Sequence, residues 1–359
     1  MHTYKIAVLA ALAGGLILFP ATAQKKKKEV TQVLQLPKEL PTTATGQTKQ
    51  ITFHVTPLSA KGLLSAQVRD ALRALLRETG SNPVLRIRAF VAGSGDLRRV
   101  RDLVSETFTD KKLPLPTLSL VQAGGLPLEG AQVVLEAIAQ AKKEVNPIGL
   151  VFAAAPLETS DNPLDSPAPL AAKSLDQLKE GLKAAGSEPA DVLRVTCFLS
   201  NLEHLAETRK LVDTDYPKAA LNFVQTQRAP RAALGACEAV ARLTRNSGKR
   251  IDWLPAEGAP KTALVSAEKL VFSGTQVSYG YQEADSKLAF ERLQKSLEGA
   301  GVTRADITFT HYYSLGEPIT AQIRKLAPGF FGNPVLSVIP VEGLASMDAG
   351  FAVDVIAAK

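Results

Sequence analysis

The feature that most constrains this 359-residue chain is a helix-to-strand passage that occurs three times, at residues 71–93, 177–200 and 292–315. In each passage, leucines at helical spacing stop at a glycine: Gly80, Gly186 and Gly301. A glycine in this place is typical of a helix C-cap, because a residue without Cβ adopts the left-handed conformation at little cost. A strand pattern follows and ends at an aromatic residue: Phe90, Phe198 and Tyr313. The same order three times indicates three copies of one unit.

The second half of the unit repeats as well. An arginine stands 11 residues after each aromatic residue: Arg101, Arg209 and Arg324. An opening strand then carries a leucine in an equivalent place: Leu118, Leu221 and Leu336. A closing strand carries an acid 18, 17 and 18 residues after these leucines: Glu136, Glu238 and Asp354. Each unit is therefore predicted to contain a strand or hairpin, a helix, a strand, a helix and two strands, as in a small α+β domain.

Helices that return the chain to the same sheet predict mixed sheets, each with two helices on one face. The opposite face also needs cover, because strand segments such as LRIRAFV and VLRVTCFL are apolar enough to make exposure costly. The sister units are the nearest cover, so we expect the three sheets to pack against one another.

Three segments carry a resemblance to a known family: AAGSEPADVLRVTCFLSNL at 184–202, LVFSGTQVS at 270–278, and the Leu-Pro turn and Glu-Ala strand within 126–139. After residue 50, nearly the whole chain resembles three tandem, divergent copies of the RidA family, also called YjgF or L-PSP proteins. The resemblance implies a chorismate-mutase-like α+β fold, which in the family forms homotrimers with ligand clefts between neighbouring subunits. Three copies in one chain then imply a monomeric, intramolecular pseudo-trimer.

The resulting domain prediction has five segments. They are a signal peptide at 1–23, a disordered Lys-rich linker at 24–50, and RidA-like domains at 51–145, 146–246 and 247–359, the first with a reduced front hairpin.

The N-terminus predicts export. Lys5, an apolar run and the Ala-Thr-Ala site before Gln24 follow the order of a cleavable signal peptide. The apolar run is shorter than the roughly 20 residues that a permanent membrane helix needs, although an uncleaved anchor is the alternative. We therefore expect a periplasmic or secreted protein without a stable membrane anchor.

The charge of the chain argues against a specific nucleic-acid partner. The formal net charge is +7, but five of the cations, Lys5 and Lys25 to Lys28, lie within the first 28 residues. The rest is nearly neutral and only 6% of the chain is aromatic, so neither a basic track nor a stacking platform is expected. No metal or other cofactor is predicted, because His54, His204 and His311 stand in separate copies without metal-ligand spacing.

The resemblance also shows where this chain departs from the family. In the family, an arginine on the opening strand holds the substrate carboxylate, and here that position is a leucine in all three copies, Leu118, Leu221 and Leu336. These leucines are predicted to form an apolar cleft wall. The position of a family glutamate falls on Val134, Ala236 and Ala352. No catalytic residue is predicted, and the acids Glu136, Glu238 and Asp354 are assigned a structural role at the end of each sheet, with catalysis as the alternative.

Five residues are candidates for ligand binding: Arg101, Arg209, Arg324, Ser273 and Gly274. A guanidinium is always charged and binds both oxygens of a carboxylate, so a helix arginine could replace the missing strand arginine. An outward or inter-domain salt bridge is the alternative for each arginine. Ser273 and Gly274 end the segment that resembles the family's front strand.

Cys197 and Cys237 lie in apolar strand-like segments. The sequence leaves two alternatives: both are small buried residues, or they form a disulfide if their strands are neighbours.

Two functions remain open at this stage. One is a non-catalytic or divergent exported protein that binds a small ligand or a protein partner at inter-domain clefts. The other is a hydrolase that releases ammonia from 2-imino or 2-enamino acids through a rebuilt anion site.

Overall fold

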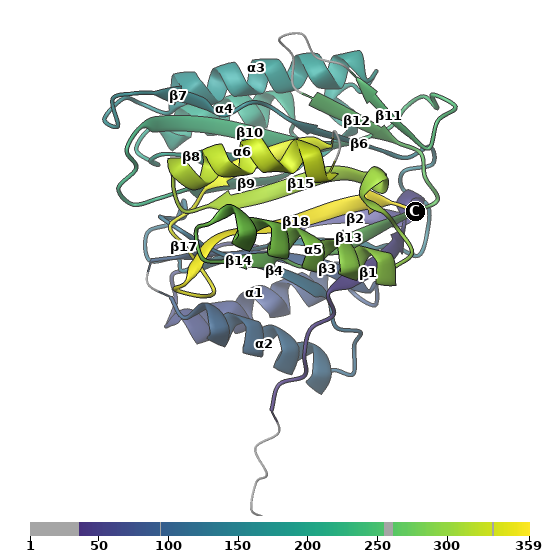
Figure 1. Ribbon diagram of the computed structural model, residues 1–359, viewed down its shortest axis with the longest axis horizontal. Coiled ribbons are helices and arrows are strands. Elements are labelled where there is room, and N and C mark those ends of the chain that lie inside the picture. Colours follow the sequence, from purple (N-terminus) through teal and green to yellow (C-terminus); the bar gives the residue numbers. More distant parts are fainter. Residues whose placement is uncertain (1–35, 94, 255–260, 332–333) are drawn as a thin grey trace, which may run out of the picture. The chain divides into compact units, whose positions relative to one another are not determined.

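Three β-sheets and six α-helices make up the part of the chain that the computed structural model describes, which is residues 36–93, 95–254, 261–331 and 334–359 (Figure 1). The predicted α+β class is confirmed. The strands of the first sheet are, in spatial order, β17 (Gly343–Leu344), β4 (Thr117–Ala123), β3 (Val84–Ala92), β5 (Val133–Gln140) and β2 (Ile51–Val55). Its helices are α1 (Leu64–Thr79) and α2 (Leu97–Asp110).

The second and third sheets follow the same plan. The second has the order β11 (Ile251–Leu254), β12 (Lys261–Val265), β6 (Leu150–Ala154), β10 (Ala233–Arg242), β8 (Val192–Leu199) and β9 (Ala220–Gln225), with β7 (Glu158–Ser160) beside β10. The third has the order β1 (Thr43–Gln47), β13 (Lys269–Ser273), β18 (Ala349–Ala358), β15 (Ile307–Ser314) and β16 (Val335–Pro340), with β14 (Gln276–Tyr279) beside β18. Their helices are α3 (Ala168–Ala184), α4 (Leu205–Asp215), α5 (Glu283–Gly299) and α6 (Glu317–Phe331).

Each sheet is mixed, as predicted. The central strands β3, β8 and β15 pair in parallel with the opening strands β4, β9 and β16, and antiparallel with the closing strands β5, β10 and β18. A parallel pair needs a crossover, and α2, α4 and α6 provide it. The three glycines predicted to end helices, Gly80, Gly186 and Gly301, have φ of 59°, 79° and 76°.

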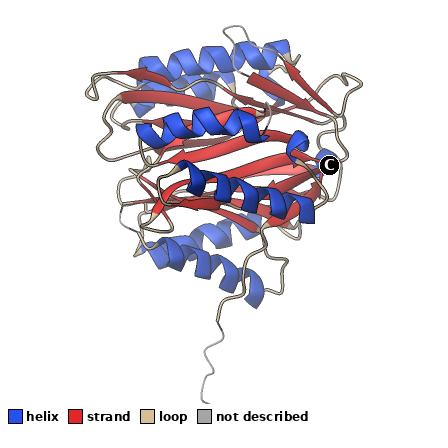
Figure 2. Cartoon of the chain, in the orientation of Figure 1, coloured by secondary structure: helices blue, strands red, loops and turns tan. Residues whose placement is uncertain are grey.

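Both faces of the sheets are covered. Each sheet has one apolar cluster between it and its own helices. Two further clusters contain side chains from all three sheets. One shared cluster contains Phe53, Phe152 and Phe272, and the other contains the repeated aromatic residues Phe90, Phe198 and Tyr313. Figure 2 shows the consequence, with strands gathered between outer layers of helices.

Strands also pass from one unit to the sheet of another. Residues 43–47 form β1 on the edge of the third sheet, antiparallel to β13, so the predicted linker is wrong for this part. The pairing uses backbone groups, which leave no apolar period in the sequence. Gly46 packs closely there, since a Cβ would lie 2.3 Å from Leu85 Cδ1 and that side chain would have to move. Likewise β12, in the segment predicted as the third domain, pairs with β6 of the second sheet. The predicted signal peptide and residues 24–35 lie outside the described residues.

No helix of the described residues is long and apolar enough to cross a membrane.

Cys197 and Cys237 form a disulfide. They lie opposite each other in the register of β8 and β10, with their Cα atoms 4.2 Å apart, and both are buried under α3 and α4. Of the two alternatives predicted for these cysteines, the structure shows the disulfide between neighbouring strands.

The disulfide should stabilise the fold. Closing a loop across 40 residues of sequence restricts the unfolded chain, so a Cys197→Ala/Cys237→Ala variant should lose about 2 to 4 kcal/mol of unfolding free energy in urea titrations. Reductant should destabilise the parent protein and leave the variant unchanged. Two reactive thiols in the denatured, unreduced parent protein would contradict the prediction.

Candidate functional site

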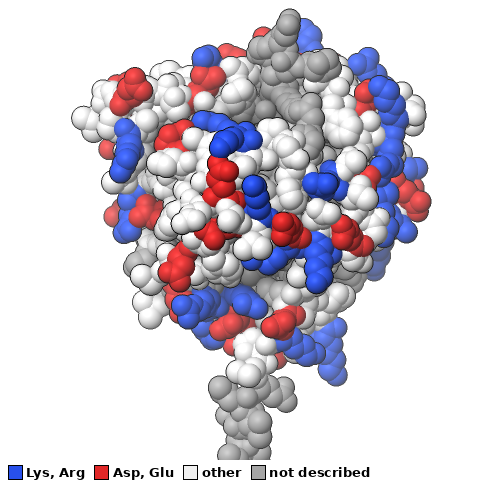
Figure 3. Space-filling model, in the orientation of Figure 1, with Lys and Arg blue, Asp and Glu red and all other residues white. Residues whose placement is uncertain are grey.

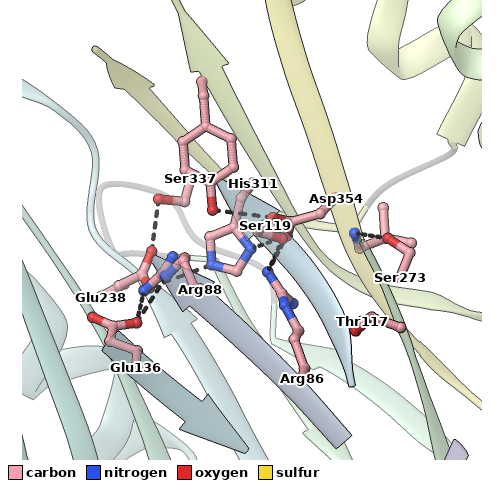
Figure 4. Close-up of polar contacts among 12 residues, drawn as sticks. Arg86, Arg88, Thr117, Ser119, Glu136, Glu238, Ser273, His311, Ser337 and Asp354 are labelled. Carbon is pink, nitrogen blue, oxygen red and sulfur yellow. Dashed lines mark hydrogen bonds and ion pairs between the residues drawn. The ribbon is translucent and has the colours of Figure 1, made fainter. Parts of the chain in front are cut away.

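A layer of charged and polar side chains lies where the three sheets meet (Figure 4). On β15, Phe309, His311 and Tyr313 are alternate residues and share one face of the strand. Phe309 belongs to one shared apolar cluster and Tyr313 to the other, so His311 lies between them. The polar layer is therefore enclosed by apolar side chains on both sides.

The layer repeats with the units. Each closing strand contributes an acid, and the central strand places one side chain directly opposite it: Arg88 opposite Glu136, Thr196 opposite Glu238, and His311 opposite Asp354. On the other side of each central strand, the opening strand places a third side chain opposite the same residue: Ser119 opposite Arg88, Asn222 opposite Thr196, and Ser337 opposite His311. Three equivalent sets of three side chains thus face one another.

Each acid accepts a hydrogen bond from the opening strand of the next sheet. The three bonds run from Asn222 Nδ2 to Glu136 Oε1 (2.6 Å), from Ser337 Oγ to Glu238 Oε2 (2.9 Å) and from Ser119 Oγ to Asp354 Oδ2 (2.6 Å). The donor lies in the second, third and first sheet respectively, so the contacts form a closed cycle through all three sheets.

Three buried arginines balance the three acids. Arg88 donates from Nε to Glu136 (2.7 Å) and from a terminal nitrogen to Glu238 (2.6 Å), and thereby joins two sheets. Arg194 donates to Glu238 (3.1 Å). Arg86 donates to Asp354, across the boundary between the first and third sheets. Burial of such charges is tolerable only because they are paired and hydrogen-bonded.

The electrostatics keep the acids ionised. Burial alone would raise the pKa of Glu238, but Arg88 and His311 outweigh it, and that pKa lies well below its usual range. Burial also opposes ionisation of Asp354, and Arg86 and His311 again shift its pKa downward. For Glu136 the pKa is lowered by Arg88 and Arg194 against the same opposition from burial.

His311 lies between two carboxylates. Its Nδ1 is 2.8 Å from Asp354 Oδ1, and its Nε2 is 3.3 Å from Glu238 Oε1. Ionised carboxylates only accept hydrogen bonds, so a ring nitrogen of His311 that contacts one of them by a hydrogen bond is the donor. Through these two contacts His311 links the acid of its own sheet, Asp354, to the acid of the second sheet, Glu238.

The acids of this layer are closed off from solvent: Glu136, Glu238 and Asp354 are 2%, 1% and 0% exposed. They lie at the centre of the three-sheet contact instead of at the end of each sheet, where the sequence had placed them. One sequence signal for this charge layer was available. Alternation within LRIRAFV places Arg86 and Arg88 on the same face of a buried strand.

Two further histidines of the described residues, His54 and His204, each lie near a carboxylate. His54 lies 2.8 Å from Glu78 and 3.0 Å from Thr52 through its two nitrogens, and His204 is 3.5 Å from Glu207. No group of three or more potential metal ligands occurs in the described ranges.

A cavity of about 320 Å³ lies between the first and second units. The first unit lines it with Val55, Thr56, Pro57, Leu58, Pro127 and Val134, and the second with Arg209, Leu221, Asn222 and Phe223. Leu221 and Val134, which the sequence resemblance predicts at the positions of a family arginine and glutamate, both line this cavity. Seven of the ten lining residues are apolar, and the amide of Asn222 is already bonded to Glu136, while Thr56 and Arg209 give the wall a polar share.

Arg209 is the cation of this cavity. Its guanidinium carbon lies 5.8 Å from the centroid of the Phe223 ring, and its Nε is 3.8 Å from Asp213. The side chain is 55% exposed, so the ion pair with Asp213 is weak and the guanidinium remains open to a ligand.

The remaining candidates lie elsewhere, and the structure does not bring the five predicted residues together. Arg101 is exposed on α2, and Arg324 pairs with Glu317 on its own helix at 3.1 Å. Ser273 is fully buried, where its Oγ accepts a hydrogen bond from the Val355 amide (2.9 Å).

Gly274 serves a contact between units. A Cβ on Gly274 would lie 2.9 Å from the Leu118 carbonyl oxygen, and the Thr275 amide donates to that oxygen at 3.2 Å. The main chain of Leu118 is thus covered by the third unit. Leu118, Leu221 and Leu336 each pack, partly buried, against the helix-side core of their own unit.

The solved structures named below each cover between 25% and 30% of this chain. No family model and no curated protein matches the chain. Among solved structures, a YjgF/YER057c/UK114 family member from Mycobacterium tuberculosis is 24% identical, covers 25% of this chain and 79% of its own, and has a TM-score of 0.24. A Rid family protein from Yersinia pestis is 18% identical over 27% and 84% of the two chains (TM-score 0.25). A YjgF family protein from Neisseria meningitidis is 15% identical over 30% and 94% (TM-score 0.23).

Loss of one acid should damage the whole layer. A Glu238→Ala substitution leaves Arg88, Arg194 and His311 facing one another without their shared anion, so we expect a loss of about 3 to 5 kcal/mol in unfolding free energy. Glu317→Ala, which removes an exposed ion pair, is the matched control and should cost under about 1 kcal/mol. Similar losses in both variants, measured by urea unfolding, would show that the layer does not hold the sheets.

Proposed function

We propose that this protein is an exported, single-chain assembly of three RidA-like units that binds a small, largely apolar ligand or a protein partner in the cavity between its first and second units. The observation that carries the proposal is the apolar wall of that cavity, with Leu221 where the family has its substrate-binding arginine. Leucine cannot pair with a carboxylate, and an unpaired anion in such a cavity would be costly.

The pseudo-trimer part of the proposal is supported by contacts at two levels. The acid layer links the three units in a cycle. Beside it, the loops after the opening strands also meet: the Gly124 amide donates to the Gln225 carbonyl (2.9 Å), Gln227 Nε2 to the Val341 carbonyl (3.0 Å) and the Glu342 amide to the Gln122 carbonyl (3.0 Å). At Gly124 a Cβ would lie 2.3 Å from the Gln227 carbonyl carbon, which accounts for the glycine.

Export is supported by the disulfide between Cys197 and Cys237, because such bonds persist in oxidising compartments and are rare in the cytosol. The predicted signal peptide points the same way. In the surface view, Lys and Arg side chains alternate with Asp and Glu on the face shown, so a nucleic-acid partner has no continuous basic track there (Figure 3).

One observation favours a second candidate function. Arg209 reaches the cavity from the helix side, 5.8 Å from the Phe223 ring, and offers a fork for a carboxylate. An imine or enamine deaminase that releases ammonia is therefore the alternative, with Arg209 in the place of the strand arginine.

The two functions are separable with one neutral probe. We expect N-phenyl-1-naphthylamine to bind once per chain, since seven of the ten residues that line the cavity of about 320 Å³ are apolar and its strands carry no anion site. Leu221→Gln should weaken this binding at least tenfold in fluorescence titrations, whereas Leu336→Gln, the same change in the third unit, should leave it unchanged. Arg209→Ala should also leave it unchanged.

Two results would count against cavity binding: no saturable fluorescence change, or equal losses in Leu221→Gln and Leu336→Gln. Ammonia release from freshly generated 2-imino acids is the test of the alternative. A rate above buffer that Arg209→Ala abolishes would establish the deaminase, and a rate equal to buffer excludes it.

The mature species provides a test of export and assembly. Protein recovered from the periplasm or the medium should begin near Gln24 by intact-mass analysis, and dilute samples should scatter light as one chain, below the 38.2 kDa of the full sequence. A retained N-terminus would refute cleavage, and a stable homotrimer would refute the pseudo-trimer.

A further inference from the structure

A second, larger depression lies on the helix side of the first unit. Its volume is about 990 Å³, and it runs between the outer face of α1, the segment 57–61 and the turn at Leu128. Asp70, Arg73, Ala74 and Arg77 line it from α1 at spacings of three and four residues, which places them on one face of the helix.

The charges around this groove have one sign. Lys61, Arg73, Arg77 and Lys111 line it, and the single acid among the lining residues, Asp70, is paired with Arg73. Arg73 is still 69% exposed, so the pairing leaves its guanidinium accessible. The groove therefore has an excess of positive charge, although the described chain as a whole carries both signs evenly.

The floor of the groove is apolar. Ala74 and Leu76 contribute from α1, and Leu128, which is 41% exposed, contributes from the opposite side. An apolar floor with cations around it is the arrangement that an amphipathic acidic chain complements, with aliphatic side chains down and carboxylates outward.

We propose that this groove binds an acidic, amphipathic segment of a partner protein. The lining contains no aromatic side chain, so it offers single-stranded nucleic acid no stacking platform. The surface is a depression of about 990 Å³, which a flat anionic membrane would not fill. The helix face from Asp70 to Arg77 is roughly 10 Å long at 1.5 Å per residue, which matches about three residues of an extended peptide.

The groove and the inter-unit cavity are separate sites with a common wall. Pro57 and Leu58 line both, and this segment is anchored next to them by the Thr56 amide, which donates to the Leu135 carbonyl at 2.9 Å. The docking proposal does not depend on what fills the cavity, because its cations come from α1, Lys61 and Lys111 and not from Arg209.

Two fluorescein-labelled 12-residue peptides with leucines in the same places, one rich in glutamate and one in lysine, test the proposal on the mature chain. The glutamate peptide should bind saturably by anisotropy and the lysine peptide should not. Arg73→Glu/Arg77→Glu should weaken binding about tenfold or more, whereas Arg98→Glu/Lys143→Glu, an equal charge change at exposed sites of the same unit, should change it less than about twofold. Binding should also weaken between about 0.1 M and 1 M salt, as the Debye length falls from about 10 to about 3 Å.

Ala74→Gln is the second variant, because it fills the groove without changing charge and keeps a good helix former on α1. It should weaken the glutamate peptide as well, and circular dichroism melts confirm folding of every variant. Equal binding of both peptides, or equal losses in the groove and control variants, would overturn the proposal. So would phosphatidylglycerol vesicles that bind the parent protein and Ala74→Gln equally while the glutamate peptide binds neither, which would assign the cations to a membrane surface.

Discussion

The charge layer between the sheets is the interaction on which the rest of the structure depends. Two apolar clusters alone would hold the three sheets together, but apolar contact is non-directional and would tolerate sliding of one sheet over another. Each acid is bonded to a donor of the next sheet, and Arg88 contacts acids of two sheets at 2.7 and 2.6 Å. A shifted register would leave buried charges unpaired, which is far more costly than a lost apolar contact. We infer that the layer fixes the alignment, while the apolar clusters supply most of the stabilisation.

A single chain can build this layer in a way that three identical subunits cannot. In a symmetric trimer, every side chain near the axis occurs three times. Here the equivalent positions hold Arg88, Thr196 and His311, opposite Glu136, Glu238 and Asp354. Three arginines at the first of these positions would crowd like charges, whereas one arginine, one hydroxyl and one histidine divide the hydrogen bonds among the acids. The differences between the units are thus complementary, and a substitution in one unit changes the hydrogen bonds of an acid in another.

The sequence predicted those features whose signals are local. The glycine caps, the helix-to-strand passages and the closing-strand acids recur at fixed spacing, and all are found on the predicted elements, although the acids lie at the three-sheet contact and not at the end of each sheet. Contacts between units have no such signal, because strand alternation shows that Arg86 and Arg88 share a face but not that Asp354 and Glu238 approach it from other sheets. The same limit explains β1, whose pairing rests on backbone groups, and Ser273 and Gly274, whose partners Val355 and Leu118 are distant in sequence.

The equivalent leucines of the three opening strands, Leu118, Leu221 and Leu336, are part of this architecture. Each packs on the helix-side core of its unit, so an arginine in its place would have to leave that core or stay buried without an acid. The clefts that they border have also become unequal. Gly274 and Thr275 cover the main chain of Leu118, while Leu221 still borders a cavity of about 320 Å³ with Arg209 at its edge. Covalent linkage permits this difference between the clefts, because a unit that is needed only to complete the three-sheet contact does not have to keep a cleft. Substitution of Leu221 or Arg209 would then alter this cavity without removing any side chain of the acid layer.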